Sequence, residues 1–323
     1  GAVGYDNAQW LIRGVGSYGS GTWNSARIFV DGFEVNSEYL VSLSPSEIES
    51  ISILKDGAAL AIYGDRGANG VIKIETKSGE VAPSTVTAKV RYGATTPNII
   101  NKPLGSYDFA NLYNQAVSND NGMVWTPAYN AEQLKAYQNG AGVNVDWYDE
   151  VLRDAGSYVD GDIIFNGGNE NARYNVNLGY LNTGGLINTK NTDQTKNLGY
   201  ERYNIRANLD FNILQIFEFR VDFNGRIEQR KRPNYGVTDL FSDLAKTPSN
   251  AYNIYDNKEL GYLSGTSIYP NNPYGSANEL GWTSQKARAL QGNFVLKEKL
   301  DIVTPGLYIE EAFSFYSYTL STY

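Results

Sequence analysis

Polar and apolar residues alternate along most of the chain beyond residue 80, with the period of two that is typical of β-strands. The run 202–212 has Tyr203, Ile205, Ala207, Leu209 and Phe211 at its odd positions, and polar or charged residues at its even positions. The run 217–228 repeats this pattern, and weaker or shorter versions lie at 85–92, 158–166, 173–180, 289–300 and 306–320. These seven runs predict seven strands of an antiparallel meander.

The connections between the predicted strands alternate in length. Long or moderate gaps lie near 95–157, 184–200 and 230–287, whereas the gaps near 167–172, 212–217 and 300–306 are short. Short turns at one rim and long loops at the other are the construction of bacterial outer-membrane barrels. The long loops carry helical patterns at 107–117, 131–138 and 238–246, which predicts that they are structured.

Alternation alone fits two architectures, because a soluble β-sandwich buries its apolar face in protein whereas a membrane barrel turns that face to lipid. Flanking Tyr and Trp residues and strands of about 11 residues favour the barrel. If Leu214 centres the hairpin turn, Arg206 lies opposite Asp222 and Leu209 opposite Phe219. The same register would place Asp210 opposite Glu218.

The first 80 residues predict a small α+β unit with shorter strands. Asp31-Gly32 is a hairpin turn signal, and Ser44, Pro45 and Glu47 form a capping-box pattern that opens a short helix. Asp56 can cap a second helix over 57–63. The predicted strands of this unit are 27–30, 33–35, 50–54 and 71–76, and a glycine-rich turn occupies 64–70.

Seven strands are too few to enclose this unit. They would close into a cylinder only about 14 Å across, whereas 80 residues have a radius of gyration of roughly 12 Å. A barrel of ~22 strands would be roughly 44 Å across and would hold the unit. We therefore expect these seven strands to be one part of a transmembrane antiparallel β-barrel that encloses the small unit. The whole barrel would belong to a longer chain.

The amino-acid composition and short motifs argue against several kinds of partner, active site and ligand site. The formal charge of −8 argues against nucleic acid as a partner. The sequence has no Cys and no His, which excludes disulfides, thiolate nucleophiles, Ser-His-Asp triads and His-ligated metals within this chain. The turn 64–70 lacks the Lys-Ser/Thr ending of a phosphate loop, and a calcium loop starting at Asp120 would lack its final Glu. No metal or cofactor is expected.

One stretch resembles a known signature. Residues 49–79, ESISILKDGAALAIYGDRGANGVIKIETKSG, resemble the plug-domain signature of SusC-like (RagA-like) TonB-dependent outer-membrane transporters. Further similarity lies in LIRGVGS at 11–17, IFVDG at 28–32, VDWYDEVL at 145–152, GYLN at 179–182 and RYN at 202–204. Nothing in the chain resembles the amino-terminal extension or TonB box of that family.

The resemblance implies a plug domain at 1–80, incomplete at its N-terminus, and the first part of the barrel at 81–323, with long extracellular loops. It implies TonB-dependent import of a bulky oligosaccharide or oligopeptide across the outer membrane, without enzymatic activity. The implied partners are TonB with its inner-membrane energising complex, a SusD-like surface lipoprotein and membrane lipid. A dimer of transporter–lipoprotein pairs is a further expectation.

The same resemblance suggests roles for individual residues. Exposed aromatic side chains would be stacking platforms for the substrate, and polar side chains would anchor the plug to the barrel. The substrate-binding candidates are Tyr18, Trp23 and Tyr39, and the anchoring candidates are Arg13, Asp56, Arg66 and Asn69.

Three alternatives stay open at this point. The first is a siderophore or haem receptor of the same architecture. The second is a barrel-embedded enzyme, for which Asp149 or Glu311 would be required. The third is a soluble carbohydrate-binding β-sandwich, which would stay outside the membrane fraction.

Overall fold

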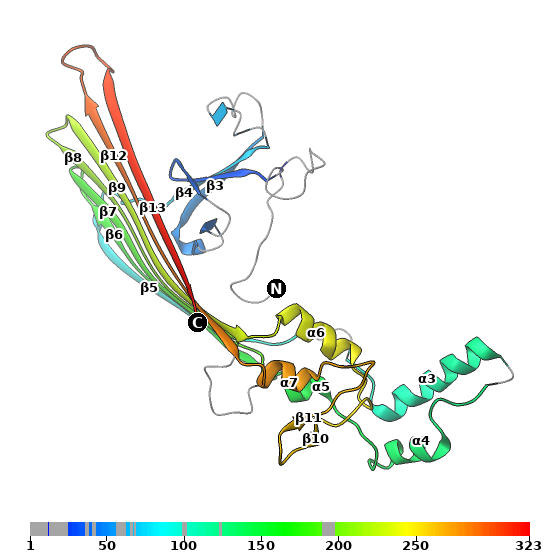
Figure 1. Ribbon diagram of the computed structural model, residues 1–323. Coiled ribbons are helices and arrows are strands. Elements are labelled where there is room, and N and C mark those ends of the chain that lie inside the picture. Colours follow the sequence, from blue (N-terminus) through cyan, green and yellow to red (C-terminus); the bar gives the residue numbers. More distant parts are fainter. Residues whose placement is uncertain are drawn as a thin grey trace.

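The computed structural model consists mainly of two β-sheets and a group of helices (Figure 1). It describes residues 12, 25–35, 39–40, 43–55, 63–64, 67, 69–98, 102–122, 125–188 and 198–323. The larger sheet, called the wall below, carries helical connections at one end and short turns at the other. We call these the loop end and the turn end.

The wall has seven strands that follow one another in space in the order of the chain. They are β5 (Ala82–Thr95), β6 (Gly156–Gly168), β7 (Ala172–Gly184), β8 (Gly199–Ile213), β9 (Phe217–Pro233), β12 (Trp282–Lys299) and β13 (Tyr308–Thr322). Every neighbouring pair is antiparallel. The predicted meander and its alternation of short turns and long loops are therefore confirmed.

The two faces of the wall are inverted relative to a soluble sheet. On the inner face, polar side chains such as Asn177 and Arg206 are buried, with 1% and 3% of their surface exposed. On the outer face, Tyr203 and Ile227 are 52% and 45% exposed. An outward apolar band and a polar interior are the pattern of a membrane barrel, because lipid covers the apolar side. This contradicts the β-sandwich alternative, which would bury the apolar face in protein.

The predicted register of the β8–β9 hairpin is wrong by two residues. Arg206 lies opposite Asn224, and Leu209 lies opposite Val221. The turn does not centre on Leu214, because both Leu214 and Gln215 adopt a left-handed conformation, with φ of 54° and 59°.

This shift changes which charges meet across the hairpin. Asp210 lies opposite Arg220 and accepts a hydrogen bond of 3.1 Å from its Nε. The like-charged pair of Asp210 and Glu218, which the predicted register would have produced, is avoided.

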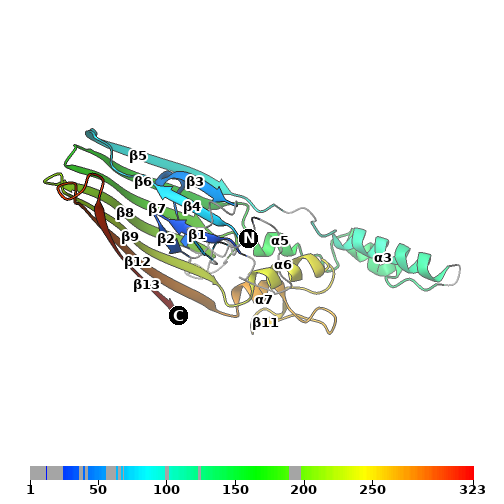
Figure 2. The same ribbon diagram turned by 90° about the horizontal axis from the view of Figure 1, so that it is seen from above.

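The smaller sheet, called the small sheet below, lies against the concave inner face of the wall (Figure 2). Its strands are β1 (Arg27–Val30), β2 (Phe33–Val35), β3 (Ile48–Leu54) and β4 (Val71–Thr76), in the order β2-β1-β4-β3. The predicted Asp31-Gly32 hairpin is present, with φ of 50° and 89° at the two turn residues. Ile28, Val30 and Ile74 lie in its apolar core.

The capping-box prediction at Glu47 is wrong. A short 3₁₀ helix, Pro45–Glu47, follows Ser44, whose Oγ accepts from the Ser46 amide. The Glu47 carboxylate does not bond back to the Ser44 amide, as a capping box requires, and instead contacts the wall. The helix expected over 57–63 lies mostly outside the described residues, as does Asp56.

Helices cluster at the loop end and confirm the three helical patterns in the long loops (Figure 1). They are α3 (Ser106–Asn121), α4 (Ala131–Gln138), α5 (Trp147–Val151), α6 (Val237–Lys246) and α7 (Pro273–Asn278), with a small hairpin of β10 (Tyr255–Asn257) and β11 (Tyr262–Leu263). Sequence reasoning missed α5, α7 and the hairpin. Trp147 from the β5–β6 connection and Leu240, Leu244 and Tyr252 from the β9–β12 connection share one apolar cluster that we call the cap core.

Trp147 is the main anchor of the cap core. Its side chain is 1% exposed, its ring meets Tyr252 at 5.3 Å between centroids, and Nε1 donates to the Pro248 carbonyl at 3.2 Å. We expect Trp147→Ala to cost about 3–5 kcal/mol of loop stability, because it leaves a large cavity. Limited proteolysis of the purified protein should then cut the loops faster.

Trp125→Ala is the matched control, since Trp125 is 38% exposed in the same long loop. We expect it to leave the cleavage rate close to that of the wild type. Equal cleavage of both variants would show that Trp147 does not hold the loops together.

Candidate functional site

The small sheet is attached to the wall by a buried polar contact, centred on the Glu47 carboxylate. Glu47 is 5% exposed at the end of the 3₁₀ helix that precedes β3. Its Oε1 accepts from Asn204 Nδ2 at 2.7 Å and from Asn177 Nδ2 at 3.3 Å. Both asparagines belong to inward positions of the wall, so a single carboxylate joins the small sheet to two strands.

Arg206 supplies the opposite charge in this contact. Its Nε lies 3.4 Å from Glu47 Oε2, and its Nη1 lies 3.7 Å from Asp31 Oδ2. Its Nη2 donates to the hydroxyl of Tyr39 at 2.7 Å, and the same hydroxyl accepts from Asn224 Nδ2 at 2.9 Å. The planar guanidinium is thereby bonded on several sides, as a buried arginine requires.

A third set of bonds lies around Thr76, the last residue of β4. Asn208 Nδ2 donates to Thr76 Oγ1 at 2.7 Å and to the Lys77 carbonyl at 2.8 Å. Asp31 accepts from the Thr76 amide at 2.8 Å and from its hydroxyl at 2.7 Å. The hairpin turn and the end of β4 are therefore fixed to each other and to the wall.

This polar contact and an apolar core differ in the free energy needed to separate the two surfaces. Buried polar groups that are bonded in place contribute modestly to stability, because water replaces the same bonds when the surfaces part. Breaking one partner while the others stay buried is expensive. The contact is therefore specific in the docked state and separable when both surfaces are hydrated.

Gly179 makes space for one of these bonds. A Cβ at this position on β7 would lie 2.4 Å from Asn204 Oδ1. We expect Gly179→Ala to push Asn204 away from Glu47 and to weaken the contact by about 1.5–3 kcal/mol, the value of a hydrogen bond to a charged group. Differential scanning calorimetry of the purified protein should show an unfolding transition at a lower temperature.

Gly161→Ala on the neighbouring strand β6 is the control. A Cβ there would lie 3.6 Å from its nearest neighbour, the Lys89 carbonyl, which is ordinary contact. An equal shift of the transition in both variants would contradict the role of Gly179.

The inner face continues toward the loop end as a polar surface. Glu228 is 2% exposed and accepts from the Tyr200 hydroxyl at 2.9 Å, from Arg226 Nε at 3.1 Å and from Arg230 Nη2 at 2.9 Å. Asp160 accepts from Arg91 and, at 3.2 Å, from the Tyr158 hydroxyl. These side chains present many donors and acceptors between the small sheet and the loop end.

The connections at the loop end carry their own polar contacts. The Tyr235 hydroxyl donates to Asp243 Oδ2 at 2.7 Å, and this bond, together with burial, raises the pKa of Tyr235 to about 12. Lys102 lies 2.7 Å from Asp146 Oδ2, and this bond raises the pKa of the Lys102 ammonium. Both contacts tie segments of the long loops together.

Of the predicted site residues, the structure describes Tyr39 and Asn69. Arg13, Tyr18, Trp23, Asp56 and Arg66 lie outside the described residues. Asn69 is half-buried in the turn before β4.

Tyr39 requires a correction. It is 4% exposed, so the expectation of an exposed stacking platform is wrong, because its ring packs in the core of the small sheet and its hydroxyl bonds Arg206 and Asn224. Sequence reasoning also missed the part that Glu47, Arg206 and Asn208 take in the contact. The available signal was the row of polar residues at even positions of 202–212.

The carboxylates considered for catalysis are not brought together. Asp149 lies in α5 at the loop end, whereas Glu311 lies on the outer face of β13 near the turn end. Among the described residues, no group of three or more His, Cys, Asp or Glu side chains could hold a metal ion. In the same part of the chain, no helix has the length and apolar character needed to cross a membrane.

Comparisons with known proteins agree with this architecture. Residues 1–71 match the TonB-dependent Receptor Plug Domain family. TonB-dependent receptor P3 of Formosa agariphila is 29% identical over 278 residues, covering 84% of this chain and 24% of the relative. TonB-dependent receptor SusC of Bacteroides thetaiotaomicron is 31% identical over 226 residues, covering 67% of this chain and 20% of the relative. The chain therefore spans about a quarter or less of the length of these relatives.

Solved structures share the fold. The RagAB peptide importer in its closed-closed state superposes with a TM-score of 0.70 at 21% identity, covering 97% of this chain and 36% of that chain. Its open-open state gives a TM-score of 0.69 with the same coverage.

The matched plug domain and the inverted faces of the wall define a TonB-dependent receptor of the bacterial outer membrane. Within this class the chain is SusC-like (RagA-like), and it covers the plug domain and the first strands of the barrel. The small sheet is called the plug below, and the turn end and loop end are the periplasmic and extracellular ends.

Proposed function

We propose that this chain is the plug and first barrel part of an importer that takes up a bulky oligosaccharide or oligopeptide across the outer membrane. In this proposal residues 1–80 form the plug and residues 81–323 begin the barrel. TonB, energised by the inner-membrane complex, displaces the plug and opens a path. The buried polar contact around Glu47 and Arg206 carries the proposal, because it holds the plug in place and can be hydrated when the plug moves.

The inner face supports a polar cargo. Tyr200, Glu228 and Asp160 lie on the extracellular side of the plug contact, among other hydrogen-bonding side chains. Hydroxyl-rich or peptide ligands bind such surfaces through many moderate hydrogen bonds. RagAB, which shares the fold, is a peptide importer, and this supports a peptide as one of these cargoes.

We further propose that a SusD-like surface lipoprotein covers the extracellular loops, and that two transporter–lipoprotein pairs associate. The loops that share the cap core would supply a preformed surface for the lipoprotein. Tyr18 and Trp23 remain proposed contacts for the cargo, and Arg13, Asp56, Arg66 and Asn69 remain proposed plug anchors.

Uptake measurements test the proposal directly. Cells with and without the receptor gene would receive labelled oligopeptide or oligosaccharide mixtures, with and without an uncoupler that collapses the proton gradient. We expect receptor-dependent accumulation of one mixture that stops with the uncoupler. Accumulation that persists without the gradient would refute TonB-dependent import. Uptake of a labelled siderophore alone would favour the siderophore-receptor alternative.

A further inference from the structure

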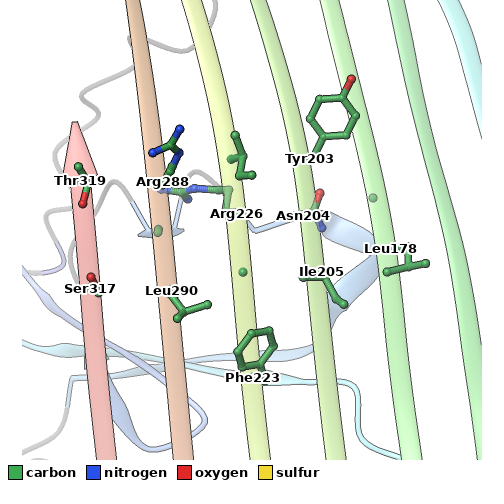
Figure 3. Close-up of a pocket in the computed structure, with 14 residues that line it drawn as sticks. Leu178, Tyr203, Asn204, Ile205, Phe223, Arg226, Arg288, Leu290, Ser317 and Thr319 are labelled. Atoms are coloured by element: carbon green, nitrogen blue, oxygen red, sulfur yellow. The ribbon is translucent and has the colours of Figure 1, made fainter. Parts of the chain in front are cut away.

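An apolar groove runs across the outer face of the wall, on the side opposite to the plug (Figure 3). It encloses about 540 Å³, a size typical of ligand sites. Leu178, Ile205, Phe223 and Leu290 line it from four neighbouring strands. Its floor is open because Gly225, which lies opposite both Ile205 and Leu290, has no side chain to fill the space.

The extracellular end of this groove is polar and positively charged. Arg288 faces outward in register with Ile227 on β9 and with Thr319 on β13. In Figure 3 the Arg288 and Tyr203 side chains point along the strands toward the tip of β13, which is the extracellular end. Ser317 lies beside Leu290 in the same row of the groove and adds a hydroxyl group.

Two lysines extend this charge beyond Arg288. Lys286 is two residues farther along β12 on the same face, opposite Gln229, and Lys231 lies two residues beyond Gln229 on the outward face of β9. Among the described residues, Arg288, Lys286 and Lys231 form no ion pair with a carboxylate. The nearby Glu201 instead accepts from the hydroxyls of Tyr180 and Tyr203.

The height of these cations in the membrane follows from the strand geometry. The outward positions of β9 are apolar or glycine from Phe217 to Ile227. Ten residue steps of ~3.3 Å at a tilt of ~40° span roughly 25 Å, which equals the usual apolar band of an outer-membrane barrel. Arg288, in register with Ile227, therefore lies at the upper edge of the outer leaflet, where lipid headgroups lie.

We propose that this groove is a binding site for one lipid of the outer leaflet whose headgroup carries phosphate. The acyl chains lie along Leu178, Ile205, Phe223 and Leu290. The phosphate is bound by the guanidinium of Arg288 and the hydroxyl of Thr319, with Lys286 and Lys231 adding attraction. A phosphate is the fitting ligand because arginine forks and hydroxyl donors match its geometry, and because these cations have no carboxylate partner in the described part of the chain.

The site gives the barrel wall a function besides enclosing the plug. A bound lipid would fill the space left by Gly225 and pair its phosphate with the Arg288 charge at the upper edge of the apolar band. It would join β7, β8, β9, β12 and β13 from outside, and so stabilise the wall when the plug moves.

Lipid binding to the purified receptor tests the site. The probes would be bis-phosphorylated lipid A, the same lipid with its phosphates removed, and phosphatidylcholine, each titrated in detergent and followed by native mass spectrometry. We expect lipid A to bind most tightly. Arg288→Gln with Lys286→Gln should weaken binding at least tenfold, the loss expected for charge-assisted hydrogen bonds. Thr319→Val, which keeps the shape of the side chain, should give a smaller loss.

Lys135→Gln is the matched control, because Lys135 is exposed on α4, far from the groove (Figure 1). It removes one of the two positive charges that the double variant removes, at a position away from the groove, and we expect wild-type affinity. Heat-modifiable migration on gels would verify that each variant is folded. Equal binding of the dephosphorylated lipid, wild-type affinity of the double variant, or an equal loss in Lys135→Gln would overturn the proposal.

Discussion

Replacing Arg206 with methionine should loosen the plug while leaving the barrel inserted. Methionine keeps much of the volume of arginine but removes the charge, so the buried Glu47 carboxylate and the partly buried Asp31 carboxylate lose their shared cation. Breaking a buried ion pair in this way costs about 3–5 kcal/mol. Cells carrying the variant should admit large hydrophilic antibiotics that the wild-type receptor excludes, and planar bilayers should show larger conductance.

Arg27→Met is the matched control for this prediction. Arg27 lies on β1 of the same plug and pairs with Glu34 at 2.9 Å, but its side chain is 54% exposed. Exposed pairs contribute only about 0–1 kcal/mol, so the plug should stay closed. If Arg206→Met remained as impermeable as the wild type at equal surface abundance, the buried contact would not be what holds the plug.

A disulfide between plug and wall should abolish import altogether. Thr76 Oγ1 accepts from Asn208 Nδ2 at 2.7 Å, so the two side chains face each other, and cysteines at both positions would join once the backbones bring their Cβ atoms to about 4 Å. The sequence has no cysteine of its own, and the periplasm is oxidising. We expect uptake to fall to background, and a membrane-permeant reductant to restore it.

The control pair is Thr283→Cys with Asn234→Cys. Thr283 Oγ1 donates to Asn234 Oδ1 at 3.0 Å, but this bond joins the start of β12 to the connection after β9 and does not touch the plug. Uptake should persist in this variant whether or not it is reduced. Continued uptake by the Thr76–Asn208 pair with its disulfide formed would mean that the plug does not leave the wall at this point.

The wall could be predicted from the sequence because one strict rule acts on each of its residues. A strand between lipid and a polar interior must alternate, and 202–212 does so at every position. Its register could not be predicted, because the left-handed turn at Leu214 and Gln215 is set by backbone conformation that the alternation does not encode. A shift of two residues leaves every side chain on the same face of the sheet, so the alternation could not distinguish the two registers.

The plug contact was less predictable for a different reason. Glu47 fits a capping box when only its neighbours along the chain are considered, yet its partners Asn177 and Arg206 are 130 and 159 residues away. Tyr39 illustrates the same problem, since aromatic side chains serve equally well in cores and in binding platforms. Long-range pairing decided both cases, and local patterns contain no information about it.

The separation between Glu47 and its partners also constrains the order of folding. The barrel strands can pair one after another as a meander, since each finds its partner in the preceding strand. Glu47 has no such neighbour and must wait until β7 and β8 have formed before its charge is matched. The plug is therefore translated before the barrel strands but docks after them. During biogenesis it stays hydrated in the periplasm until the barrel around it has begun to close.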